Sequence, residues 1–521
     1  MTEWDAELAE LADRKKLAAA MGGAERVTRQ HTAGRLTVRE RIDRLLDAET
    51  WRESGALTGT ATYDAEGVLK EFVPTNFVTG VGAIEGQRVV VAADDFTVRG
   101  GAADASIHEK QVYAERMAGE TGIPLVRLID GTGGGGSVKT LEEQGRTYVP
   151  YNPGWDHVVA NLARIPVVSC ALGPVAGLGA ARLVSSHIAI GVRGISQVFV
   201  AGPAVVEAGM GESVDKEALG GIDVVARAGT VDLVVDDEEA AFTAVRNVLA
   251  LLPPNTATLP MRVEPTDDPL RRYDALRDLV PKDRRAPYDV RQLMRHVFDQ
   301  DTLLELSRPY APSTVTALAR LDGWPVAVLA SDPRFYGGGM TADGADKMAH
   351  FVDLAETFRL PVVHLVDQPG FVIGSAAERA GTIRHGARAL AAVYQSSVPW
   401  ASVLIRRVFG VAGAAHRPHH RYTYRVAWPS GDWGSLPIEG GLEVAFKRML
   451  AEAGDDAERL KAEIADRLEA VRSPFRTAES FLVEDIIDPA ETRPLLADWV
   501  RTSYDVLQQT HHRKPRVQPR P

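Results

Sequence analysis

The feature that most constrains this chain is a long internal repeat, in which one stretch of sequence matches another 237 residues further on. Residues 86–95 (GQRVVVAADD) and 323–332 (GWPVAVLASD) each combine a turn glycine, an apolar run and an aspartate. The register continues without a gap and pairs Gly100 with Gly337, Gly101 with Gly338, Lys110 with Lys347, Pro124 with Pro361, Asp130 with Asp367, and Gly133 with Gly370. After a slip of four residues, Pro166 matches Pro399 and Gly177 matches Gly410. We interpret this repeat as a duplicated unit.

Each copy has the same predicted order of elements: strand, Gly-Gly turn, helix, strand, glycine-rich turn, helix, strand and a second glycine-rich turn. The first helix of each copy is expected at about residues 106–119 and 343–358, and the strand after it at 123–129 and 360–366. Strands that alternate with helices favour right-handed β-α-β crossovers. The sequence therefore predicts a layered α/β fold for each copy.

Prolines divide the two copies. Seven of them lie between positions 253 and 287, a density that suits neither a helix nor the interior of a sheet. We therefore expect an N-terminal domain at 1–252, a linker at 253–287 and a C-terminal domain at 288–521. The capping box Thr37-Val-Arg-Glu40 opens an amphipathic segment at 36–46, so residues 1–48 should form a helical arm that packs on a partner or on the body. Residues 511–521 are expected to be a disordered tail.

Composition excludes several classes of protein. The chain has 521 residues and a net charge of −11, which disfavours nucleic-acid binding. Its single cysteine, Cys170, excludes a disulfide framework and a cysteine-based zinc site, and it favours the cytoplasm. The longest uncharged stretch, residues 165–181, contains two prolines and three glycines, so we expect no membrane span. The charged N-terminus does not resemble a signal peptide.

One glycine-rich turn in each copy follows an apolar strand directly: residues 130–137 (DGTGGGGS) and residues 367–371 (DQPGF). Glycine lets a turn present backbone N–H groups without a Cβ in the way, and such groups stabilise the oxygen of a thioester enolate. Neither turn has the spacing of a phosphate-binding P-loop or a dinucleotide-binding motif. The alternative is a flexible surface turn, but the duplicated position favours hydrogen-bond donation.

A second glycine-rich turn in each copy, residues 173–179 and 409–413, could supply the opposite donors. The alternative is that its small residues allow close packing of a helix on a sheet. We call the two turns of one copy together its cradle. Two cradles in one chain suggest two carbonyl compounds that share one proton or carboxyl group.

At this point the sequence resembles the carboxyltransferase (β) subunits of biotin-dependent acyl-CoA carboxylases, of the propionyl-CoA carboxylase type, over about 450 residues. The resemblance rests on an ordered set of segments: residues 30–47 (QHTAGRLTVRERIDRLLD), 95–101 (DFTVRGG), 282–289 (KDRRAPYD), 366–371 (VDQPGF), 383–387 (IRHGA), 424–429 (YRVAWP) and 484–493 (EDIIDPAETR). It implies tandem duplicated crotonase-like (ClpP/crotonase) β-β-α superhelix domains.

The resemblance also implies a mechanism. Carboxybiotin, carried on a partner protein, releases carbon dioxide near an acyl-CoA; the biotin anion takes the α-proton, and the enolate attacks carbon dioxide. By the same likeness, the first-copy cradle binds the thioester oxygen and the second-copy cradle binds the biotin ureido oxygen. The residues concerned are Gly133 and Gly134 with Gly177 and Leu178 opposite, and Gly410 and Val411 with Pro369 and Gly370 opposite; Phe371 and Ala414 complete the predicted substrate site.

The resemblance further implies a biotin carboxylase or biotin carboxyl carrier subunit as partner. It implies a homo-oligomer, usually a hexamer, with each active site between the first copy of one subunit and the second copy of another. No bound metal and no side-chain nucleophile is required. We accordingly expect the histidines, among them His364, His385, His416, His419 and His420, to be satisfied or solvated rather than catalytic. Lys139 and Arg182 could reach CoA phosphates, although a solvated basic residue is the simpler interpretation of each.

The sequence departs from the family pattern at several points. Residues 408–414 read VFGVAGA where propionyl-type chains read AYGGAYD, and the first glycine turn has one additional glycine. Val411 keeps a backbone N–H but restricts the turn to negative φ. Residues 433–437 (WGSLP) replace the usual IAVMG, so the pocket floor differs. Propionyl-CoA is therefore only the default substrate. A decarboxylase subunit of the same fold and a non-catalytic scaffold stay as alternatives.

Overall fold

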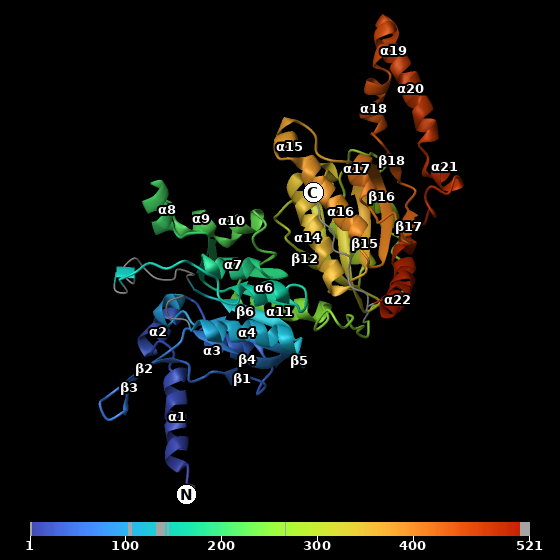
Figure 1. Ribbon diagram of the computed structural model, residues 1–521. Coiled ribbons are helices and arrows are strands. Elements are labelled where there is room, and N and C mark those ends of the chain that lie inside the picture. The colour runs from blue at the N-terminus through green and yellow to red at the C-terminus, as the bar shows by residue number, and fades with distance from the viewer. Residues whose placement is uncertain (1–2, 103–106, 132–140, 143–144, 266, 511–521) are drawn as a thin grey trace. The chain divides into compact units, whose positions relative to one another are not determined.

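The computed structural model describes residues 3–102, 107–131, 141–142, 145–265 and 267–510. The chain forms two compact units, Met1–Thr258 and Leu259–Pro521 (Figure 1). The boundary between them in the sequence falls inside the proline-rich segment that was expected as a linker. Residues 259–287 belong to the second unit, where the Arg262 guanidinium donates to the Asp322 carboxylate at 2.9 Å and Leu276 is buried.

The first unit is built on a seven-stranded sheet in the order β1-β4-β5-β6-β7-β9-β11. Its strands β1, β4 and β5 are antiparallel neighbours, and the remaining pairs are parallel. The bounds are β1 Arg52–Ser54, β4 Phe77–Ile84, β5 Gln87–Asp94, β6 Leu125–Ile129, β7 Val167–Ala171, β9 Ile188–Val192 and β11 Leu233–Val235. Helices α3 (Val38–Leu45), α4 (His108–Thr121), α7 (Leu178–Val184) and α11 (Glu238–Leu251) contact its strands.

The second unit repeats this plan with the strand order β12-β13-β14-β15-β16-β17, and β18 also pairs with β16. The bounds are β12 Leu304–Leu306, β13 Thr314–Leu321, β14 Trp324–Ser331, β15 Val362–Gln368, β16 Trp400–Phe409, β17 Tyr424–Ala427 and β18 Asp432–Gly434. Helices α13 (Val290–Val297), α14 (Ala342–Phe358), α16 (Thr382–Gln395), α17 (Gly410–Ala414) and α22 (Thr492–Thr510) surround the sheet.

The duplication is confirmed element by element. The hairpin β4–β5 and the hairpin β13–β14 have bounds exactly 237 residues apart, and so do the short 3-10 turns Arg99–Gly101 and Tyr336–Gly338. Within each turn the first glycine is left-handed, with φ of 63° at Gly100 and 61° at Gly337. The Gly-Gly pairs of the sequence therefore mark one backbone conformation used twice.

The repeat also extends further upstream than the sequence suggested. Helix α3 with β1 matches α13 with β12 at an offset of 252, because the first unit inserts 15 more residues around the hairpin of β2 (Gly59–Tyr63) and β3 (Leu69–Pro74). The Asp47 carboxylate accepts from the Gly86 amide at 2.8 Å, and Asp299 accepts from Gly323 at 2.8 Å. Further matched pairs are Arg39 and Arg291, Thr50 and Thr302, and Glu53 and Glu305. The end of the expected arm is thus an integral part of the repeat.

The capping box expected at Thr37 is present. The Thr37 hydroxyl accepts from the Glu40 amide at 3.3 Å, and the Glu40 carboxylate accepts from the Thr37 amide at 2.7 Å. Helix α13 starts with the corresponding cap, in which Asp289 accepts from the amides of Arg291 and Gln292. By contrast, α1 (Asp5–Ala19) buries only Ala18.

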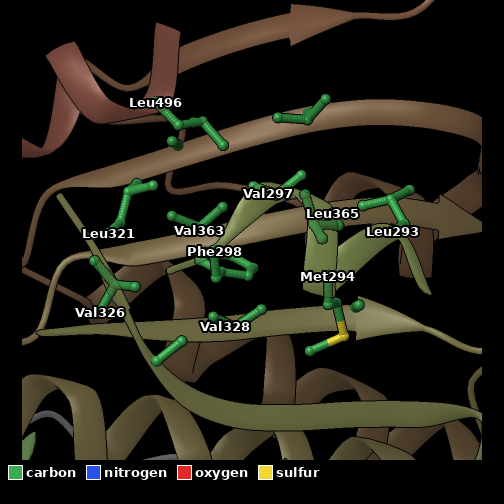
Figure 2. Close-up of a cluster of buried hydrophobic side chains, with 14 of the residues drawn as sticks. Leu293, Met294, Val297, Phe298, Leu321, Val326, Val328, Val363, Leu365 and Leu496 are labelled. Carbon is green, nitrogen blue, oxygen red and sulfur yellow. The ribbon is translucent and has the colours of Figure 1, made fainter. Parts of the chain in front are cut away.

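The core of the second unit lies between α13, the sheet and α22. Helix α13 presents Val290, Leu293, Met294 and Val297, a spacing that gives one apolar helical face. Figure 2 shows three of these side chains, Leu293, Met294 and Val297, against strand residues such as Val328 and Val363 and against Leu496 of α22. In the described part of the first unit, two apolar clusters pack on its sheet. No helix in the described part of the chain is long and apolar enough to cross a membrane.

Candidate active site

In the first unit, the second glycine turn opens helix α7. Gly177 has φ 56° and ψ −121°, a conformation that favours glycine, and Leu178 is the first residue of the helix. The amides of a first helical turn have no acceptor within the helix, so those at the start of α7 are available as donors. The other turn reaches the same helix: a Cβ at Gly179 would lie 3.3 Å from the Gly131 carbonyl oxygen. Gly133, Gly134 and Lys139 lie outside the described residues.

In the second unit, the corresponding turn opens helix α17. Gly410 has φ 60°, which matches Gly177, and Val411 follows inside the helix, where φ is negative. The residue that needs glycine is therefore Gly410, and valine fits at 411. The side chain of Val411 is 52% exposed, and Ala414 is exposed as well. Valine at position 411 therefore preserves both the turn and the first backbone amides of α17.

The partner turn of the second unit lies beside α17. Gly370 has φ 115°, and a Cβ there would be 3.8 Å from the Phe409 carbonyl oxygen. The Gly370 amide donates to the Gln368 side chain at 3.0 Å, and its carbonyl accepts from Met340 at 3.0 Å, so the turn is held on both sides. The structure thus brings Pro369 and Gly370 together with the start of α17.

Two further segments complete the surroundings of this cradle. The Phe371 ring packs so closely on helix α16 that a Cβ at Gly386 would lie 2.2 Å from it. The segment that departs from the family pattern is also adjacent: a Cβ at Gly410 would lie 3.4 Å from the Ser435 carbonyl oxygen. Residues 433–437 therefore adjoin the second-copy cradle.

A buried carboxylate stands at the start of one turn in each cradle. Asp367 accepts from the Arg407 side chain at 2.7 Å and from Arg406 at 3.0 Å. Burial alone would raise the pKa of Asp367, but the two guanidinium groups, Arg407 foremost, hold it below its ordinary value. Asp130 accepts instead from Arg41 at 2.7 Å and Arg35 at 3.1 Å.

The arginines that bond to Asp130 and to Asp367 come from different parts of the two units, and this difference explains why residue 173 is a glycine. Gly173 occupies the position that Arg406 has in the second unit, and a Cβ there would lie 2.0 Å from the Asp130 carboxylate. Glycine thus leaves room for Arg35, from the segment before α3, to reach the same carboxylate. Sequence reasoning used Asp130 and Asp367 only as register markers and missed these ion pairs.

The expectation for Arg182 was wrong. Arg182 is only 8% exposed. Its guanidinium lies 3.7 Å from the Glu115 carboxylate, and it lies over the Phe77 ring at 5.7 Å from the ring centre. A buried guanidinium with these partners is neither solvated nor placed for a CoA phosphate. Its position on α7, one helical turn after the apolar residue Leu178, gave no signal of burial.

Asp94, at the end of β5, is a further residue that the sequence did not single out. Its carboxylate accepts from the Asp130 amide at 3.3 Å, so it lies directly beneath the first-copy turn. Burial raises the pKa of Asp94 to about 6, and the nearby Arg182 cation only partly offsets this. The matched residue of the second unit is Ser331.

Two buried histidines, His364 and His416, are each bonded to a backbone carbonyl through Nδ1, whereas His416 Nε2 is buried without a partner among the described residues. His364 is bonded to the His416 carbonyl oxygen at 3.1 Å, and His416 to that of Gly413 at 2.8 Å. Burial lowers the pKa of His364 to about 4 and that of His416 to about 3, so both are neutral at pH 7. His385 does have a carboxylate partner, Asp346 at 2.7 Å, which the sequence did not indicate. Among the described residues, no group of three or more His, Cys, Asp or Glu side chains could hold a metal ion.

Comparison with known proteins identifies the family of this chain. The carboxyl transferase domain model matches residues 29–516. The carboxyltransferase subunit of propionyl-CoA carboxylase from Haloferax mediterranei is 31% identical, over 94% of each chain. The α subunit of methylmalonyl-CoA decarboxylase from Veillonella parvula is 30% identical, over 91% of each chain.

Among solved structures, the transcarboxylase 12S hexamer with methylmalonyl-CoA bound superposes with a TM-score of 0.87 at 30% identity, covering 100% of this chain and 98% of that one. The shared fold is the duplicated crotonase-like architecture that the sequence predicts. The chain therefore belongs to the carboxyl transferase domain family, as an acyl-CoA carboxyltransferase.

Proposed function

We propose that this chain is the carboxyltransferase subunit of a biotin-dependent acyl-CoA carboxylase that adds a carboxyl group to the α-carbon of an acyl-CoA. The observation that carries the proposal is that Gly177 and Gly410 each open a short helix with a positive φ, 56° and 60° respectively. Donors preorganised in this way stabilise an oxyanion without any side-chain nucleophile.

In this proposal the two cradles have different ligands. The amides of Gly133, Gly134 and Leu178, with Gly177 opening the turn, hold the thioester oxygen while the α-proton is removed. The amides of Gly410 and Val411, with Pro369 and Gly370 opposite, hold the biotin ureido oxygen, and Phe371 and Ala414 line the pocket. Carboxybiotin, bound to a separate carrier subunit, supplies the carboxyl group. No metal ion is needed for these steps.

The same proposal includes assembly and location. We propose a homo-oligomer, with the hexamer of the transcarboxylase 12S structure as the expected size. Each active site would combine the first copy of one subunit with the second copy of another. A biotin carboxylase or biotin carboxyl carrier subunit in the cytoplasm is the expected partner, in keeping with a buried, unpaired Cys170.

The test is a panel of acyl-CoA esters incubated with labelled bicarbonate, ATP, this chain and its cognate biotin subunits. We expect acid-stable label in one or more of the esters, with propionyl-CoA as the first to examine. Transfer only from methylmalonyl-CoA or malonyl-CoA to free biotin would favour the decarboxylase reading, to which the Veillonella relative lends weight. Complex formation without turnover in either direction would favour a scaffold.

A further inference from the structure

In each unit, a basic side chain lies at the same position of a buried central strand. Arg127 lies in β6 (LVRLI) between Ala92 of β5 and Ser169 of β7. The corresponding residue of β15 is His364, which lies between Leu329 and Ser402 in the same register. The list of matched positions is therefore Ala92 with Leu329, Arg127 with His364, and Ser169 with Ser402.

Arg127 holds the C-terminal end of α7. Its guanidinium donates to the carbonyl oxygens of Arg182 at 3.0 Å and Ser185 at 2.7 Å, in the last turn of the helix and just past it. The remaining edge of the guanidinium is fully used by Glu115 of α4, at 2.8 Å and 2.9 Å. Because both charged groups are buried, this orientation is fixed from two sides.

His364 holds α17 in the same way. The carbonyl oxygen of His416, two residues after the end of α17, accepts from His364 Nδ1 at 3.1 Å. It also accepts from Trp400 Nε1 at 2.8 Å and from Ser402 Oγ at 2.8 Å, both in β16. Because a carbonyl oxygen only accepts, the proton of the neutral imidazole is on Nδ1.

The held helices are those that open the cradles. Helix α7 has seven residues and α17 has five, so each is short enough to move as one rigid piece. A side chain that fixes the C-terminal end therefore also fixes the amides at the N-terminal end. A displacement of the reacting groups by about 1 Å costs on the order of 10²-fold in rate.

We propose that Arg127 and His364 are matched positioning residues, each of which sets the donor amides of one cradle by holding the far end of the helix that carries them. The proposal rests on the proposed function, because it assigns the two cradles to different ligands. It adds that the two halves are adjusted independently. A change at His364 should affect the use of biotin, and a change at Arg127 should affect the use of the CoA ester.

The test for the second unit compares His364→Leu with His364→Asn in the full-length oligomer. Carboxyl transfer from methylmalonyl-CoA, or from malonyl-CoA where the panel prefers it, to free biotin is measured while each substrate is varied. We expect His364→Leu to lower kcat/KM for biotin by about 10- to 100-fold and to leave the KM for the CoA ester within about twofold. In His364→Asn, the amide nitrogen takes the place of Nδ1, so most of the biotin-side activity should return.

The test for the first unit uses the double variant Glu115→Gln/Arg127→Gln, because Arg127→Gln alone would leave a buried, unpaired carboxylate. Its folding is checked by circular dichroism and by its oligomeric state. We expect the KM for the CoA ester to rise and kcat to fall, about 10- to 100-fold in kcat/KM, with little change in the KM for biotin. If the double variant does not fold, the His364 pair still decides the proposal.

The serines at matched positions of the two units, Ser402 and Ser169, provide the control variants. Ser402→Ala removes one donor to the His416 carbonyl and should weaken the use of biotin in the same sense as His364→Leu, but less. Ser169→Ala removes a buried hydroxyl that has no hydrogen-bond partner among the described residues, and it should change neither KM. Equal effects of His364→Leu on both substrates, or none, would overturn the proposal. Failure of the wild-type chain to transfer carboxyl in either direction would instead overturn the proposed function.

Discussion

At the scale of single residues, backbone conformation decides which positions of the cradles can vary. Gly410 has φ 60°, a region that β-branched residues hardly enter, whereas Val411 lies in the negative-φ region of α17. The replacement of a family glycine by Val411 is thus compatible with a functional turn. The residue of this turn that must be glycine is Gly410, immediately before Val411.

Gly410→Val should therefore disrupt the second-copy cradle. The new side chain forces the turn out of its left-handed conformation and moves the first amides of α17. Since loss of one oxyanion donor costs about 10²–10³ in turnover elsewhere, we expect kcat for carboxyl transfer to fall by on the order of that factor. Gly440→Val is the control, because a Cβ at Gly440 meets no atom within 4 Å. Unchanged turnover in Gly410→Val would show that this turn does not donate to the reacting carbonyl.

Asp94 predicts a pH dependence of stability. The pKa of Asp94 is raised to about 6 in the folded chain, so the folded state holds this proton more tightly than the unfolded state does. Ionisation of Asp94 therefore lowers the free energy of unfolding progressively as the pH rises from about 4 to 6, and this reduction is constant above that range. The group contributes no such loss when both states are protonated.

Asp94→Asn keeps an acceptor for the Asp130 amide and removes the ionisation. We expect its melting temperature to rise relative to the wild type as the pH increases from 4 to 7, with little difference at pH 4. Thermal scans of the intact oligomer at both pH values give the measurement, and Asp156→Asn, at an 82% exposed side chain, is the control. A difference that does not depend on pH would mean that the Asp94 carboxyl titrates normally.

At the scale of elements, the start of α3 is defined by hydrogen bonds that the sequence reveals. Thr37→Ala removes the hydroxyl that accepts from the Glu40 amide, and an N-cap of this type contributes about 1 kcal/mol to stability. We expect an earlier unfolding transition in urea, with activity per folded molecule unchanged. Thr28→Ala, in which only a bond to the carbonyl of Ala24 is lost, should shift the transition much less. Equal shifts would argue against the capping box as the source.

Much of the fold could be predicted because the repeat and the capping box are local patterns. The strands and helices of each copy, the Gly-Gly turns and the glycine turn before α17 all follow from residue types a few positions apart. Arg182 was misjudged because its burial depends on Glu115 and Phe77, which are far away in the sequence. The match of α3 with α13 was missed because the inserted hairpin changes the offset between the two copies.

The candidate site was predicted only in part for the same reason. The glycine turns carry their own signal, since few other residues follow a strand in that pattern. The residues that hold them do not: Arg127, His364 and Asp94 are single polar residues in or at the end of apolar strands, and nothing nearby in the sequence marks their partners. Which carbonyl each one bonds depends on how the crossovers pack.

At the scale of the whole molecule, surface composition predicts assembly. Helix α8 (Pro203–Met210) has one charged residue, Glu207, and no buried residue, although Val205 and Met210 are 62% and 79% exposed. An apolar helix without a cover within its own chain is typical of an interface between subunits.

We therefore expect the wild-type chain to form a stable oligomer in light scattering. The double change Val205→Lys/Met210→Lys should shift it toward smaller species, because two charges would have to be buried in the interface. Val68→Lys, at an equally exposed position in the hairpin of β2 and β3, should leave the size unchanged. A wild-type chain that is active as a monomer would contradict both the assembly and the shared active site.

The hairpin of β2 and β3 has a practical consequence. The second unit makes the same step from its edge strand to its central hairpin with 15 fewer residues, so the sheet itself does not require this excursion. At the tip, Asp64 accepts from the amides of Glu66 and Val68. The neighbouring Tyr63 accepts from Arg14 of α1 at 3.2 Å. The tip is therefore a natural place to attach a fluorescent dye or an affinity epitope, through which the enzyme could be followed or immobilised while both cradles stay untouched.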